Sequence, residues 1–309
     1  MHRASARSLA CVLLAASAIL QAAPGKDILI DATHVFPESI TSTSAGAVIT
    51  GSFKGVIFRA QPGESLAKAW IRPTPENGLQ AVFGVLADEK SNTLWVCSVP
   101  NPFERSAHPK PSAVVALDLK SGASKGIYDF PGGGTCNDIA IARDGSAYAT
   151  DTPNGRLLRL PPGGKALEVF GQDEKLKGID GLVFSGDGTL YINIVSSGAL
   201  LRVGIADGRM GQLTELKVSQ PLAGPDGFRL ISGNRFLIAE GSGGRIDEVV
   251  IEGDTAQVRV LREGLNSSPG VTLVGKTVYA IEGKIGYLID PKLKGQDPGP
   301  FTIHAIALN

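Results

Sequence analysis

The sequence predicts an all-β protein, a six-bladed β-propeller with four-stranded blades. A short motif recurs six times at intervals of about 45 residues. Each copy is followed by a turn, by an apolar or aromatic residue on a second strand, and then by a third run that usually begins at a glycine. Repeats of this length with several short strands are typical of propeller blades. The six copies open at Glu38, Phe83, Asn137, Asp180, Asp226 and Pro269.

Hairpin turns delimit the strands within a copy. In the third copy we expect strands at 137–142, 147–151, 157–160 and 165–170, because Asp144-Gly145 and Asn154-Gly155 are strong short-hairpin signals. The second-strand residues of the six copies are Ile49, Trp95, Tyr148, Tyr191, Phe236 and Tyr279. The third runs begin at Gly55, Ser112, Gly155, Gly198, Gly244 and Gly286.

The ring must also close. Segments 27–32 and 301–308 both have strand-like patterns, and we expect one of them to complete the last blade, since an open ring would expose unpaired strand edges. The chain has 309 residues, 39 of them glycine, as expected where every blade needs tight turns. The copies follow one another without a linker, so we interpret residues 24–309 as a single domain.

The N-terminal residues predict a secretory signal at 1–23. Arg3 and Arg7 precede an apolar stretch at 9–20, and small residues follow, so cleavage after Ala18 or Ala22 is expected. The apolar stretch is too short to span a bilayer. Cys11 allows a lipoprotein as the alternative. We therefore expect an exported protein, periplasmic or secreted. Lys plus Arg and Asp plus Glu both number 30, without a long charged run, which argues against nucleic acid as a partner.

Export permits disulfide formation between the two remaining cysteines. Cys97 ends the second strand of the second copy, and Cys136 immediately precedes the third copy, so both are expected at the same end of the tunnel. The spacing allows either a disulfide or two buried free thiols.

The opening residues predict a metal site. If they begin the innermost strands, Glu38, Asn137, Asp180 and Asp226 all lie at one end of the central tunnel. The first three precede the turn glycines Gly46, Gly145 and Gly188 by about eight residues, and Asp226 precedes Gly233 by about seven. The donors are all oxygens, which suits calcium, with manganese or zinc as alternatives. Asp144 and Asp187, by contrast, are simple turn formers.

The second copy contains a longer segment at 99–111 that is rich in proline and carries His108. Because this connection emerges at the same end of the tunnel, it is expected to act as a lid or specificity loop, or else as a proline-stiffened surface loop. His34 and His304 are expected to have surface or structural roles.

Three motifs resemble the senescence marker protein/gluconolactonase family of six-bladed propellers, which is similar more distantly to paraoxonases and strictosidine synthase. These are Phe36-Pro37-Glu38, Cys136-Asn137-Asp138 and Pro225-Asp226-Gly227. The resemblance covers nearly all of the mature chain. It implies a catalytic divalent metal, usually calcium, and an activity that opens lactones or related esters.

The resemblance also implies roles for single residues. Asp226 matches the family's Pro-Asp-Gly aspartate and is the expected base, with Asp180 as the alternative. Asp180 stands where the family usually has asparagine, and Thr135 stands where sugar lactonases often have a substrate-binding arginine. These departures favour a less polar lactone or ester. We take Thr135, Phe83 and His108 as candidate substrate-binding residues.

Three functional classes follow from these observations. The first is a metal-dependent lactonase or esterase acting on a small molecule. The second is a non-catalytic propeller, plugged by a metal, that binds a small molecule or a protein partner. The third is a lyase of the strictosidine synthase type.

Overall fold

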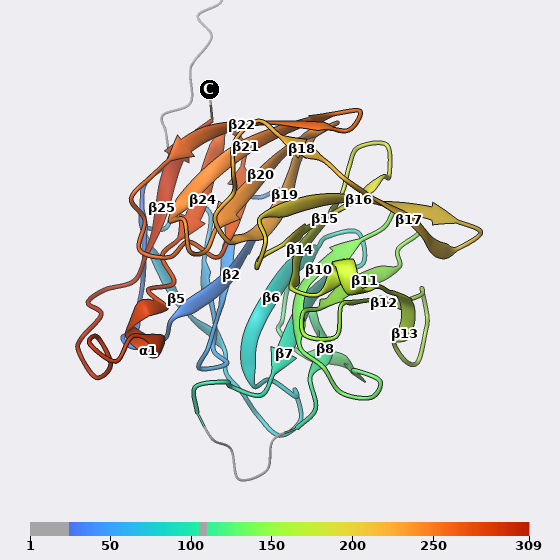
Figure 1. Cartoon of the computed structure of the whole chain (residues 1–309). Helices are drawn as coiled ribbons and strands as arrows, with labels where there is room; N and C mark the ends of the chain where they lie inside the picture. Colours follow the sequence, from blue (N-terminus) through green and yellow to red (C-terminus); the bar gives the residue numbers. More distant parts are fainter. Residues whose placement is uncertain (1–24, 105–109, 309) are drawn as a thin grey trace, which may run out of the picture.

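The computed structural model describes residues 25–104 and 110–308, which form a ring of β-sheets (Figure 1). The prediction of six four-stranded blades is confirmed, with consecutive strands pairing in order from the inside outward. The first strands of successive blades contact one another around the ring, so these strands surround the central tunnel. The predicted signal at 1–23 and His108 lie outside the described residues.

Blades one to three follow the repeat closely. Blade one contains β2 (Pro37–Ser42), β3 (Val48–Ser52), β4 (Ile57–Ala60) and β5 (Leu66–Ile71). Blade two contains β6 (Ala81–Asp88), β7 (Thr93–Val99), β8 (Ala113–Asp118) and β9 (Ser124–Asp129). Blade three contains β10 (Cys136–Ile141), β11 (Ala147–Asp151), β12 (Arg156–Leu160) and β13 (Glu168–Gln172). The last of these begins three residues later than predicted, because the turn after Leu160 is longer.

Blades four to six complete the ring. Blade four contains β14 (Ile179–Phe184), β15 (Leu190–Ile194), β16 (Ala199–Ala206) and β17 (Arg209–Glu215), and is preceded by the short helix η1 (Glu174–Leu176). Blade five contains β19 (Pro225–Ser232), β20 (Arg235–Glu240), β21 (Arg245–Glu252) and β22 (Thr255–Arg262), with β18 (Lys217–Val218) added in parallel to β22. Blade six contains β23 (Val271–Val274), β24 (Thr277–Ile281), β25 (Thr302–Ala307) and β1 (Ile28–Ile30).

Both terminal segments close the ring, whereas the sequence predicted that only one would. β25 is the third strand of blade six, and β1 is its outermost strand, with Ile28 opposite Ile303. β1 also pairs in parallel with β5 of blade one, with Leu29 opposite Leu66. The two blades therefore form one eight-stranded sheet, and no strand of the last blade is missing.

The predicted third run at Gly286 is wrong. Residues Gly286–Ile289 form the short helix α1, and β25 supplies the third strand instead. The segment between β24 and β25 leaves the sheet because Tyr287 and Leu288 pack against the core next to blade one. Among the described residues, no helix is long and apolar enough to cross a membrane.

The recurring second-strand residue packs one blade against the next. Tyr148 makes edge-to-face contacts with Phe170 of its own blade and with Phe184 of blade four. Tyr191 makes the equivalent contact with Phe236 of blade five, at 5.5 Å between ring centroids. Large side chains on this strand therefore bury apolar surface between blades and stabilise the ring.

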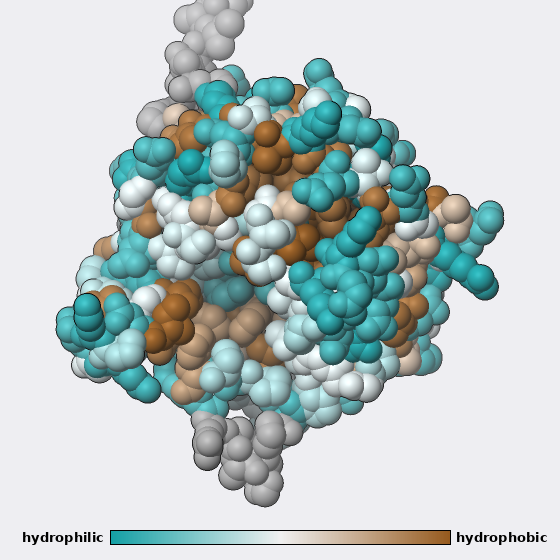
Figure 2. All heavy atoms as spheres, in the orientation of Figure 1, coloured by the Kyte–Doolittle hydropathy of each residue, from teal (hydrophilic) through white to brown (hydrophobic). Residues whose placement is uncertain are grey.

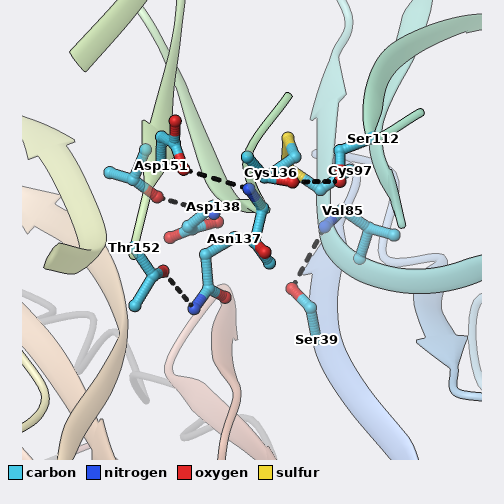
Figure 3. Close-up of a disulfide and its surroundings, with 12 residues drawn as sticks. Ser39, Val85, Cys97, Ser112, Cys136, Asn137, Asp138, Asp151 and Thr152 are labelled. Carbon is cyan, nitrogen blue, oxygen red and sulfur yellow. Dashed lines mark hydrogen bonds between the residues drawn. A yellow bond between two sulfur atoms is a disulfide. The ribbon is translucent and has the colours of Figure 1, made fainter. Parts of the chain in front are cut away.

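Cys97 and Cys136 form a disulfide, with their Cα atoms 5.2 Å apart (Figure 3). The bond joins β7 to β10 and so ties blade two to blade three. Of the two alternatives that the sequence left open, the structure therefore has the bridge. Cys136 immediately precedes Asn137, so the bridge also anchors one of the predicted site residues.

Candidate functional site

A β-bulge lies at the motif-opening residue in five of the six blades. In blade three the pairing passes from Cys136 opposite Asp151 to Ile139 opposite Ala149, which leaves one extra residue on the inner strand. The same shift occurs in β2, β6, β14 and β19. A bulge bends its strand and redirects a side chain. The repeat thus brings its opening residues to one end of the tunnel.

Polar side chains from the second strands fix these bulges. The hydroxyl of Thr150 accepts a hydrogen bond from the amide of Asp138 at 2.9 Å, and Thr50 donates to the carbonyl of Ser39 at 2.8 Å. Asn193 does both in blade four, because its Oδ1 accepts from Gly181 and its Nδ2 donates to the carbonyl of Asp226. Asn193 therefore couples blades four and five beneath the site.

The structure brings the four predicted ligands together. Asn137 Nδ2 donates to Asp180 Oδ2 at 2.9 Å, and Glu38, Asn137 and Asp180 are buried while Asp226 is half-buried. The carboxyl groups of Asp180 and Asp226 lie within hydrogen-bonding reach of each other. The four residues come from blades one, three, four and five, so the site exists only in the closed ring.

Burial and mutual repulsion raise the pKa of all three carboxyl groups. Burial is the larger cause for Asp180, whose pKa rises to about 7, and the charge of Asp138 adds to it. Burial, then the charges of Asp180 and Glu38, raises the pKa of Asp226. Burial and the charge of Asp180 raise the pKa of Glu38 in the same way. Three acids held this close need protons or a cation to offset their charge.

The amide of Asn137 is oriented for a ligand. Its Nδ2 also contacts the hydroxyl of Thr152 at 3.1 Å (Figure 3), so both amide hydrogens have acceptors. This leaves the amide oxygen Oδ1 as the atom that could coordinate a cation. Thr152 and Asn193 were not predicted as site residues, because neither belongs to the opening motif. Each is a polar residue at the end of an otherwise apolar second strand, and this contrast could have identified them.

An ion pair lies beside the acids inside the tunnel. Arg229 on β19 donates from both terminal nitrogens to the two carboxylate oxygens of Asp138, at 2.6 and 2.9 Å. Both side chains are nearly buried, with exposed fractions of 11% and 6%. On the far side, a cavity of about 330 Å³ is lined by Arg229 and by apolar side chains that include Ile139, Phe184 and Leu230. This ion pair was not predicted from the sequence.

Two of the three predicted substrate-binding residues, Thr135 and Phe83, lie in the described part of the chain. Thr135 is half-buried, and its backbone amide donates to Asp151 Oδ1 at 3.0 Å. Phe83 is half-buried at the ring position equivalent to Asn137 and contacts Phe53 edge-to-face. His34 is exposed, and His304 lies between Asp27 and Glu282 in blade six, at 3.3 and 3.4 Å.

The side chains gathered at the tunnel end offer only oxygen atoms to a cation, the ligand type that calcium prefers. Asp180 Oδ1 is buried and receives no hydrogen bond, and it stands beside Asn137 and Asp226. In residues 25–104 and 110–308, no three His, Cys, Asp or Glu side chains lie at metal-binding spacing by themselves. A cation would therefore need the amide oxygen of Asn137 and small rotations of the carboxylates. Calcium tolerates such a flexible all-oxygen set.

Comparisons with known proteins establish the fold. No protein-family model matches the sequence, and no curated protein matches it. The structure is similar to a gluconolactonase from Xanthomonas campestris, with a TM-score of 0.64, 16% identity, and coverage of 94% of this chain and 99% of that chain. It is also similar to a luciferin-regenerating enzyme, with a TM-score of 0.64, 12% identity and coverage of 89% and 92%.

A third solved structure of the same shape is virginiamycin B lyase from Staphylococcus aureus, with a TM-score of 0.61, 15% identity and coverage of 90% and 83%. The fold is thus that of propellers found in gluconolactonases and other enzymes, and the structural resemblance predicted from the motifs is confirmed. At these identities the likeness describes architecture, so the chemistry must come from the residues of the site.

Proposed function

We propose that this protein is a divalent-metal-dependent hydrolase that opens a lactone or related ester at the tunnel mouth. The observation that carries the proposal is the buried Asp180 carboxylate, which shares hydrogen-bonding reach with Asn137 and Asp226 while its Oδ1 receives no donor. An arrangement of this kind is costly without a ligand, because unpaired buried charge is strongly disfavoured.

Glu38, Asn137, Asp180 and Asp226 would hold the cation, with calcium the best match to their oxygens. When bound, it would polarise a carbonyl and acidify a water molecule. The remaining work falls to the chain itself. Arg229 and Asp138 neutralise each other within the tunnel. The negative charge of the other three acids is therefore available to attract a cation.

Asp226 is the best candidate for the base. It is the most exposed of the three acids, and burial, followed by the charges of Asp180 and Glu38, raises its pKa. Asp226 would take a proton as water adds to the carbonyl carbon. The ring C–O bond then breaks, and the same carboxyl returns the proton to the departing alkoxide. Asp180 is the alternative base, but its Oδ2 is engaged by Asn137.

A lyase is the second candidate, because the fold is shared with virginiamycin B lyase. Hydrolysis incorporates oxygen from water into the product, whereas elimination does not. The two can therefore be told apart by running the reaction in ¹⁸O-labelled water and measuring product mass.

The direct test is a panel of lactones and aryl esters assayed with calcium, manganese, zinc and chelator. Turnover that disappears with chelator and returns with one cation supports the proposal. Cation binding by calorimetry without turnover of any substrate would instead identify the non-catalytic, metal-plugged propeller. Turnover that is indifferent to chelator would contradict the metal-dependent mechanism.

A further inference from the structure

Aromatic side chains replace polar ones on one side of the tunnel mouth. In blade three, Asn137 opens the inner strand, and Thr152, directly after the second strand, contacts it at 3.1 Å. By the register of the blades, Phe83 is the counterpart of Asn137 in blade two, and Phe53 is the counterpart of Thr152 in blade one. Phe53 and Phe83 contact each other edge-to-face, at 5.1 Å between ring centroids.

A third aromatic residue extends this contact outward. Phe103, in the loop after β7, packs edge-to-face on the other side of Phe53 at 5.2 Å. Phe53 is only 6% exposed, whereas Phe103 is 38% exposed. Phe83, Phe53 and Phe103, which we call the aromatic strip, therefore run from the ring of opening residues out over blade one. Figure 2 shows apolar side chains along one edge of the central hollow.

The strip is held in place by polar contacts. Asn101 Nδ2 donates to the carbonyl of Phe53 at 2.9 Å, and Asn101 Oδ1 accepts from the amide of Phe103 at 2.9 Å. An ion pair between Lys54 and Glu104 joins the loop to blade one a second time. Beside Phe53 is a cavity of about 270 Å³, lined also by Pro73, Gln80 and Asn101. Phe103 is thus positioned over blade one by the fold.

We propose that the aromatic strip is the subsite for the apolar part of the substrate, so that the preferred lactones or esters carry a hydrocarbon chain or aryl group. This inference rests on the proposed function. The polar side chains at Asn137, Asp180 and Asp226 face the reacting group, while the strip gives a hydrocarbon chain an apolar surface leading away from them. Substrates whose every carbon bears a hydroxyl would leave those groups without partners against Phe83 and Phe53.

The test compares γ-butyrolactone with γ-decalactone, which differ only in a six-carbon chain. Full burial of each methylene improves binding by up to about four-fold. We expect the longer lactone to have the higher kcat/KM, mainly through a lower KM. Phe103→Ala should reduce kcat/KM for γ-decalactone by about ten-fold or more while changing that for γ-butyrolactone little. Ile205→Ala, which removes an exposed apolar side chain on β16, is the matched control.

A binding measurement separates this inference from the proposed function. Calorimetry with decanoate in the presence of calcium should give an affinity that falls in Phe103→Ala and is unchanged in Ile205→Ala. If no lactone or ester is turned over but this pattern holds, the hydrolase proposal fails and the subsite stands. Equal kcat/KM for both lactones, or equal losses on both in Phe103→Ala, would overturn the subsite. Absence of decanoate binding in a protein without turnover would overturn it as well.

Discussion

Asp138 and Arg229, 91 residues apart in the chain, form a two-pronged ion pair that links blade three to blade five inside the tunnel. Burial alone would lower the pKa of the guanidinium, but the charge and hydrogen bonds of Asp138, together with the charges of Asp226 and Glu38, outweigh it, and the pKa of Arg229 is raised. The pair stands between the acid cluster and the cavity on the far side.

Replacing one member of this ion pair should lower the free energy of unfolding more than replacing both members. Arg229→Met leaves the buried Asp138 carboxylate unpaired and should lower the free energy of unfolding by about 3 to 5 kcal/mol. The double variant Arg229→Met/Asp138→Leu should lose clearly less, since it leaves no orphan charge. Urea denaturation of the two single variants and the double variant measures the coupling. Additive losses would show that the pair contributes no interaction.

Cation binding should stabilise the fold. Protein stripped by chelator and then given calcium at about 100 times its Kd should gain about 2.7 kcal/mol, seen as a higher Tm. Asp180→Ala should abolish the gain because it removes the buried Oδ1 and Oδ2. Asp187→Asn alters an exposed turn and serves as the control. A gain that persists in Asp180→Ala would place the cation elsewhere.

The base and the ligand roles should separate by substitution. Asp226→Asn keeps an oxygen but cannot accept the proton, so turnover should fall by about 10² to 10⁴ at saturating metal. Glu38→Gln should instead weaken cation affinity and recover activity when excess cation is added. Steady-state kinetics across a metal titration distinguishes the two. Near-normal turnover in Asp226→Asn would transfer the base role to Asp180.

A second acid pair should make stability depend on pH. Asp247 on β21 and Glu240 at the end of β20 are both fully buried beside Arg245. Burial, then the contact with Glu240, raises the pKa of Asp247 to about 8. Because the folded-state pKa is raised, the unfolded chain loses this proton first, and wild-type stability should fall as the pH rises from about 4 to 8.

Asp247→Asn removes the titratable carboxyl group while keeping a polar side chain of similar size. Its Tm relative to wild type should therefore improve steadily between pH 5 and pH 8. Thermal melts at intervals of one pH unit would show the trend, with Asp254→Asn on the surface as a control. A constant difference in Tm across this range would mean that Asp247 is already ionised in the folded protein.

The disulfide should contribute substantially to stability. Cys97 and Cys136 are 39 residues apart, and a cross-link of that loop length constrains the unfolded chain by about 4 kcal/mol. The Cys97→Ala/Cys136→Ala variant should show this loss in urea, and reductant should then have no further effect on it. A wild-type midpoint unchanged by full reduction, verified by thiol titration, would contradict the estimate.

The blades and the gathering of the opening residues at one end of the tunnel could be predicted from sequence because both repeat. Each opening residue precedes its turn by a nearly constant number of residues. The bulges then direct the opening side chains toward the same end of the tunnel. Glycine follows the opening residue in four of the six copies. At Gly181 the reason is visible: an added Cβ would lie 2.1 Å from the carbonyl oxygen of Asp226 on the neighbouring strand.

The Asp138–Arg229 pair could not be predicted from a single copy, since partners 91 residues apart meet only in the closed ring. A comparison of the six copies would have shown that both residues are unusual at their positions. Asp138 occupies a position that is usually glycine, and Arg229 occupies one held elsewhere by Thr41, Leu86, Ala140, Val183 and Thr272. The pairing of β1 with β25 could not be predicted from local sequence patterns either. Both segments are strand-like, and either could have closed the ring.

The closure of blade six sets an order of events during synthesis. β1 is made among the first residues of the domain, yet its antiparallel partner β25 is among the last. Until β25 has been made, β1 can pair only with β5, and the ring that gathers the opening residues is not closed. Deletion of β25 would therefore remove the strand that joins β24 to β1 and would split the eight-stranded sheet.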